Sequence, residues 1–159
     1  TFTLVTATPA GLGLVIGGRI ADVRGRRLVI AVAVPIATLL VLGSFTIDGA
    51  PMWLSAFGGG FVGGIAVPAL AVYRAELFPT GNRSRAAGLL TASALGGGIV
   101  GLLLVGELRD RGWSYSSVIG LVALGQLLVV LIVLTRFPET AHQELEALNP
   151  EDRPPPALA

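Results

Sequence analysis

Charged residues divide this chain into five long uncharged runs, and these runs restrict what the chain can fold into. They cover residues 1–18, 28–47, 49–73, 86–106 and 112–135. A helix crosses the hydrocarbon core of a bilayer with about 20 residues, because each residue adds about 1.5 Å of rise. The runs are continuously apolar, whereas the strands of a membrane barrel alternate. The sequence therefore predicts an all-α integral membrane protein with five transmembrane helices.

The composition agrees with a membrane protein and argues against several other classes. Hydrophobic residues make up 53% of the chain, charged residues only 13%, and the mean hydropathy is +0.78. A net charge of +1, without a basic face that carries aromatic residues, argues against nucleic-acid binding. The chain has no cysteine and one histidine, His142. We therefore expect no metal site, no cofactor and no catalytic triad.

The arginines are distributed unevenly between the gaps that separate the runs. One side would carry Arg19, Arg24, Arg26, Arg27, Arg74, Arg83, Arg85, Arg136 and Arg153, and the other side only Arg109 and Arg111. Cytoplasmic loops carry an excess of basic residues, so the richer side is predicted to be cytoplasmic. This predicts a multi-pass cell-membrane protein whose first residue lies outside and whose C-terminus lies in the cytoplasm.

The composition changes after Phe137. The following residues, PETAHQELEALNPEDRPPPALA, are polar and then rich in proline. Such a composition fits a short helix that fades into a disordered segment. We expect a five-span bundle over residues 1–138 and a partly disordered cytoplasmic tail over residues 139–159.

Glycine pairs four residues apart are frequent inside the runs. They are Gly13/Gly17, Gly59/Gly63, Gly60/Gly64 and Gly97/Gly101. Small residues at this spacing let helix backbones approach each other in lipid, so we predict close packing there instead of substrate contact. The third run also contains Pro68, which removes a backbone hydrogen bond and is the predicted hinge.

The stretch GGRIADVRGRR, residues 17–27, is predicted to form a tight cytoplasmic turn between the first two spans. Gly18 would let the first helix end, Gly25 permits a positive φ, and Asp22 can cap the helix or pair with the arginines. The stretch resembles the loop signature of the major facilitator superfamily. The matching residues are Gly18, Asp22, Gly25, Arg26 and Arg27, while Val23 stands where the family usually has a basic residue.

Two further stretches extend the resemblance over nearly the whole chain. YRAELFPTGNRSRAAG, residues 73–88, is similar to the family's segment after the tenth helix, and RFPET, residues 136–140, to the segment that closes the twelfth helix in sugar porters and related symporters. The resemblance implies that the five spans are helices eight to twelve. They would form most of the C-terminal six-helix bundle, with helix seven and the N-terminal half of the carrier outside this chain as its partner.

Acidic and basic residues of three separate segments are expected at the same depth on the cytoplasmic side. They are Asp22, Arg26, Arg27, Glu76, Arg83 and Glu139. Carboxylate and guanidinium groups that are partly desolvated favour pairing, and such a cluster can latch helices in one state of an alternating-access carrier. The resemblance implies the same network. The alternative is that these are independent interfacial charges.

The substrate is less visible in the sequence. No acid or base lies in the middle of a run, so a proton carrier would belong to the other half of the carrier. The polar residues at mid-span are Thr91, Ser93 and Gln126, which line a substrate path or make hydrogen bonds between helices. Ala71 stands where sugar porters have a tryptophan, which argues against a hexose.

The sequence thus favours transport of a small organic solute by a secondary, ion-coupled, alternating-access carrier embedded in the lipid bilayer. The alternative is a truncated, non-transporting membrane protein that acts as a partner or scaffold. An intramembrane enzyme would need catalytic polar residues that converge at membrane depth, and the sequence offers none.

Overall fold

A computed structural model describes residues 2–141 and 143 of the chain. These residues form five α-helices and contain no strand. The helices are α1 (Phe2–Arg24), α2 (Arg26–Thr46), α3 (Ala50–Glu76), α4 (Arg83–Asp110) and α5 (Tyr115–Arg136). Each predicted run lies mostly in one helix, and the expected all-helical fold is confirmed. Most of the predicted tail, residues 142 and 144–159, lies outside the described residues.

Four of the helices, α2 to α5, are long and apolar enough to cross a membrane by length and composition. Helix α1 is not among these four, although residues 1–18 were predicted as the first span. It continues beyond that run and includes Arg19, Asp22 and Arg24.

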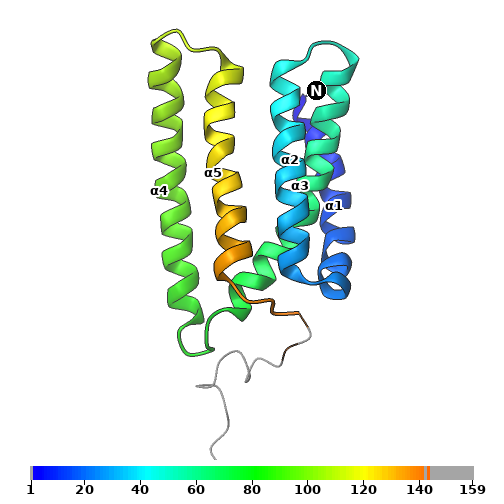
Figure 1. The fold of residues 1–159 in the computed structure, drawn as a ribbon, viewed down its shortest axis with the longest axis vertical. Helices are drawn as coiled ribbons and strands as arrows, with labels where there is room; N and C mark the ends of the chain where they lie inside the picture. The colour runs from blue at the N-terminus through cyan, green and yellow to red at the C-terminus, as the bar shows by residue number, and fades with distance from the viewer. Residues whose placement is uncertain (1, 142, 144–159) are drawn as a thin grey trace, which may run out of the picture.

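The helices alternate in direction, so their connections gather at two opposite ends (Figure 1). The α1–α2 turn, the α3–α4 connection and the end of α5 lie at the lower end in this view, and the α2–α3 and α4–α5 connections lie at the upper end. Helix α3 packs along both α1 and α2, and α5 packs on α2. Helix α4 stands beside α5 with few contacts, and none of its residues is buried.

Glycine allows the backbones of α1 and α3 to touch. A Cβ added at Gly17 would lie 2.6 Å from Cα of Ile65, and one added at Gly64 would lie 2.9 Å from Cα of Ala10. Neither position can hold a side chain unless the helices separate. The predicted close packing is therefore confirmed between α1 and α3.

The glycines of the predicted pairs Gly59/Gly63 and Gly97/Gly101 do not lie in the contact between α1 and α3. A Cβ at Gly59 would lie 3.0 Å from Cγ2 of Val41, so this glycine faces α2. At Gly97 and Gly101 an added Cβ would meet nothing within 4 Å. The close packing predicted for that pair is wrong for the described chain, because α4 has no helix against this face.

The buried core lies toward the lower end of the bundle, next to the α1–α2 turn. Ile30 and Ala69 are completely buried, and Ala21, Tyr73 and Val133 join them from α1, α3 and α5. The predicted hinge, Pro68, lies inside α3 immediately before this core. In Figure 1 the last part of α3 leans toward the lower end of α5. The core therefore joins four helices where their charged ends meet.

We predict that Gly17→Ala destabilises the bundle, because the new methyl group would overlap the backbone of Ile65. Overpacking of this kind costs about 1–3 kcal/mol. Thermal unfolding in detergent measures the effect. Gly97→Ala is the matched control, since it makes the same change in a helix with open space around it. Equal midpoints for the two variants would contradict the close α1–α3 contact.

Candidate functional site

The α1–α2 turn consists of a single residue outside the helices, Gly25. Its φ is +97°, a conformation that residues with a side chain rarely adopt, so the predicted positive φ is confirmed. Gly18, the other glycine assigned to the turn, lies inside α1. The expectation that it ends the helix is wrong, because glycine permits a helix end but does not force one. The helix continues until Gly25 reverses the chain.

Glu139, which follows α5, covers the N-terminus of α2. Its Oε1 accepts the backbone N–H of Arg26 at 3.0 Å, and its Oε2 accepts that of Arg27 at 3.2 Å. The first N–H groups of a helix have no partner inside it, and an anion there is favoured by the helix dipole. Gly25 supplies no side-chain cap. Glu139 therefore acts as the cap of α2 from another part of the chain.

A side chain at Gly25 would collide with the carboxylate of Glu139. A Cβ at Gly25 would lie 2.7 Å from Oε2 of Glu139. Oε1 of Glu139 also accepts the N–H groups of Thr140 and Ala141, each at 3.0 Å. This folds the segment after α5 around the carboxylate. Thr140 is only 2% exposed, so residues assigned to the start of the tail are packed against the bundle.

The guanidinium of Arg26 joins two acids. Its Nη2 lies 3.1 Å from Oε1 of Glu76 on α3 and 3.2 Å from Oδ1 of Asp22 on α1. The side chains of Arg26 and Glu76 are 13% and 17% exposed, whereas Asp22 is 69% exposed. An exposed pair contributes little, so the contact with Glu76 is the stronger of the two. It links the start of α2 to the end of α3.

Two further hydrogen bonds attach the end of α5 to this site. The guanidinium of Arg27 donates to the carbonyl oxygen of Leu134, in the last turn of α5. The hydroxyl of Tyr73 donates to the carbonyl oxygen of Pro138, and its ring packs edge-on against Phe137 with centroids 6.5 Å apart. Cations and donors near a helix C-terminus satisfy carbonyls that have no partner in the helix. The site thus joins α1, α2, α3 and the segment after α5.

Most residues of the predicted cluster meet at this site. Asp22, Arg26, Arg27, Glu76 and Glu139 lie in or beside it, as the contacts above show. We call these five residues the charged junction. Glu139 was expected to pair with guanidinium groups, but it holds backbone N–H groups instead. The sequence offered one hint, because α2 begins with Arg-Arg directly after Gly25, which has no side chain to cap it.

Arg83, the sixth residue of the predicted cluster, forms no ion pair with an acid of the described residues, and its Nε is buried without a hydrogen-bond partner there. Together with Arg74 it lines a small pocket of 140 Å³ between α3 and α4.

Tyr73 is the residue that the prediction of the junction omitted. A buried tyrosine at the end of a span, whose hydroxyl needs a partner, was the available signal.

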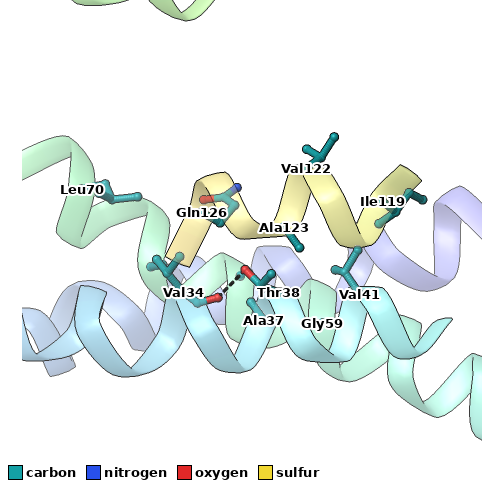
Figure 2. A pocket seen from close by; sticks show the side chains of 12 residues that line it. Val34, Ala37, Thr38, Val41, Gly59, Leu70, Ile119, Val122, Ala123 and Gln126 are labelled. Atoms are coloured by element: carbon teal, nitrogen blue, oxygen red, sulfur yellow. Dashed lines mark hydrogen bonds between the residues drawn. The ribbon is translucent and has the colours of Figure 1, made fainter. Parts of the chain in front are cut away.

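A cavity of 330 Å³ lies between α2, α3 and α5 (Figure 2). Thr38 and Gln126 are its polar side chains, near the middle of α2 and α5, and the rest of the lining is apolar or glycine. The hydroxyl of Thr38 donates to the carbonyl oxygen of Val34 at 2.8 Å. No ionisable side chain among the described residues lines this cavity. It is suited to neutral, mostly apolar groups.

Only one of the three predicted substrate-lining residues faces this cavity, and it is Gln126. Thr91 lines the smaller pocket with Arg83, and its hydroxyl donates to the carbonyl oxygen of Ala87 at 2.8 Å. Ser93 lies on the exposed α4. Within the described part of the chain, no group of histidine, cysteine and acidic side chains could hold a metal ion.

Comparison with known proteins gives one family and two relatives. The family model described as Major Facilitator Superfamily matches residues 1–159. A protein of Bacillus subtilis (strain 168), named as a niacin/nicotinamide transporter, NiaP, is 38% identical over 77 residues, which are 48% of this chain and 19% of that protein. The puromycin resistance protein pur8 of Streptomyces alboniger is 34% identical over 111 residues, 67% of this chain and 22% of its own length. The matches thus span about a fifth of either relative.

We predict that Glu139→Ala opens the start of α2, because two backbone N–H groups lose a charged acceptor. Such a bond contributes about 1.5–3 kcal/mol. Amide hydrogen exchange at Arg26 and Arg27 should therefore accelerate about tenfold or more. Glu107→Ala, which removes an exposed acid at the opposite end, is the control and should leave these amides unchanged. Unchanged exchange in Glu139→Ala would show that the carboxylate does not cap α2.

Proposed function

Because this chain belongs to the major facilitator superfamily, a family of helical integral membrane transporters, we propose that it is a C-terminal portion of a secondary, ion-coupled carrier that moves a small organic solute by alternating access. The five helices would then be the eighth to the twelfth of the carrier. The substrate would lie between this bundle and the other half, near the middle of the membrane.

The charged junction is the observation that carries this proposal. It joins the three segments that resemble the family's signatures, and all three lie at the same end of the bundle (Figure 1). Alternating access requires helices that hold together at one end in one state and separate in another. Contacts between side chains and helix ends, as in Arg26–Glu76 and Glu139–α2, are the contacts that such a cycle would form and break.

The chemistry of the described residues supports a small and largely uncharged solute. The cavity that Gln126 lines contains no ionisable group, and a charge in such surroundings would be costly. The sequence around Pro68 and RFPET favours the sugar-porter and metabolite-symporter branch, while Ala71 argues against a hexose. The two relatives are named for niacin/nicotinamide and for puromycin resistance, which makes nicotinamide and puromycin the first compounds to try.

The proposed orientation has the charged junction in the cytoplasm and the α2–α3 connection outside the cell, in the plasma membrane. The arginine distribution supports it, because Arg19, Arg24, Arg74 and Arg85 lie in the helix ends beside the junction. In this arrangement residues 1–138 form the membrane bundle and residues 139–159 the cytoplasmic tail.

A non-transporting membrane protein that acts as a partner or scaffold is the second candidate. The open face of α4 supports it, because this helix could lie against another protein. The coding sequence upstream of Thr1 distinguishes the two: a carrier requires a further half with its own spans. Uptake by the complete protein in liposomes then tests transport directly.

We predict from the orientation that a cysteine placed at Val23 is protected from an impermeant thiol reagent on intact cells, whereas one at Ile47 reacts. Both side chains are exposed in the structure, 68% and 45%, so reactivity reports the side of the membrane. The natural chain has no cysteine to interfere. Reaction at Val23 combined with protection at Ile47 would reverse the proposed orientation.

We predict that Arg26→Gln and Glu76→Gln each slow transport by the complete carrier several-fold and leave solute binding nearly unchanged. The double variant should be no slower than the worse single variant, since the two residues share one contact. Initial rates of uptake of radiolabelled nicotinamide, or of puromycin, measure this. Arg111→Gln is the control, because its pair with Glu107 is exposed and local. Losses that add in free energy would mean that Arg26 and Glu76 act independently.

A further inference from the structure

The small pocket between α3 and α4 has charge at one side and apolar wall at the other. Arg74, near the end of α3, and Arg83, the first residue of α4, contribute the charge. The remaining lining is Ala75, beside Arg74, and Ala71, Ala87, Leu90 and Thr91, which lie deeper along the two helices. The Thr91 hydroxyl is already used, since it donates to the carbonyl oxygen of Ala87. Leu90 is seven residues beyond Arg83, about 10 Å along the helix axis at 1.5 Å per residue. The pocket therefore changes from cationic to apolar in the direction of the membrane interior.

The two arginines of this pocket lack the partners that Arg26 and Arg27 have. Arg26 pairs with two acids, and Arg27 donates to a backbone carbonyl. Among the described residues, no acid lies within ion-pair distance of Arg74 or Arg83. In the same part of the chain, the Nε atoms of Arg26, Arg27 and Arg83 are all buried without a hydrogen-bond partner, but only Arg26 and Arg27 have bonds from their Nη2 atoms to compensate. Burying part of a guanidinium is costly unless an anion or acceptor compensates. An anion bound in this pocket would therefore compensate the positive charge of the two guanidinium groups.

The shape of the pocket indicates which anion fits. Its volume of 140 Å³ holds one phosphate-sized group but not a whole lipid. Guanidinium groups bind phosphate oxygens through paired N–H bonds. A free phosphate would make no favourable contact with the apolar wall that Leu90 and the alanines form. None of the residues of α4 is buried, so acyl chains could lie along this helix beyond the pocket.

We propose that the pocket formed by Arg74 and Arg83 binds the phosphodiester headgroup of an anionic phospholipid, with its acyl chains along α4. Basic pockets between helices at a membrane surface attract such headgroups, and the cytoplasmic leaflet is rich in anionic lipid. The binding itself does not depend on the proposed transport activity. Only the choice of leaflet depends on the proposed orientation.

The test is lipid binding by the full chain in a neutral detergent, measured by native mass spectrometry with added phosphatidylglycerol. Phosphatidylcholine has the same phosphodiester but no net charge, and we expect it to bind at least about fivefold more weakly. Arg74→Gln and Arg83→Gln should each weaken phosphatidylglycerol binding about fivefold or more. Arg74 is exposed, so its variant keeps the test valid if Arg83→Gln fails to fold.

Arg85→Gln is the matched control, because it removes the same charge two residues from Arg83 without altering the pocket lining. We expect its binding to change less than twofold. An effect of Arg85→Gln as large as that of the pocket variants would mean general surface attraction and overturn the proposal. Equal binding of the two lipids would also overturn it. Displacement of phosphatidylglycerol by millimolar inorganic phosphate would assign the pocket to free phosphate and reject the lipid.

Discussion

The carboxylate of Glu139 is the contact on which the charged end of the bundle depends. Helix α2 begins directly after a glycine that offers no cap, so its first N–H groups need an acceptor from elsewhere. Glu139 provides it and thereby ties the segment after α5 to the α1–α2 turn. The bonds of Arg27 and Tyr73 to the neighbouring backbone follow from that placement. One carboxylate thus brings together parts of the chain that are 113 residues apart in sequence.

The bundle also shows that one residue type can serve two purposes. The glycines of α1 and α3 bring two backbones together, whereas those of α4 at Gly97 and Gly101 have open space around them. The difference lies in the neighbours, because the absence of a side chain is useful for packing only where another backbone is near. The apolar surface of α4 is left to lipid and, in the proposed function, to the other half of the carrier.

The arginines at the charged end of the bundle are of two kinds. Arg26 and Arg27 hold helices together through acids and a carbonyl, while Arg74 and Arg83 face a pocket. The sequence predicted one cluster that included Arg26, Arg27 and Arg83, since all three are arginines at the same depth. Their different surroundings depend on how far α4 stands from α2, and the pattern along the chain carries no information about that distance. Thr91 and Ser93 lie away from the cavity that Gln126 lines for the same reason, because they belong to α4 and the cavity lies between α2, α3 and α5.

The sequence by itself determined the five helices, the positive-φ turn at Gly25 and the arginine-rich end. These are local properties, because the cost of placing charge in lipid and the freedom of glycine act residue by residue. Only the tertiary structure decided that Glu139 caps α2, that α1 continues through Gly18, and that Arg83 stands apart from the junction. Those outcomes depend on which helix lies beside which, and helix contacts in lipid are set by shape between segments that are distant in sequence.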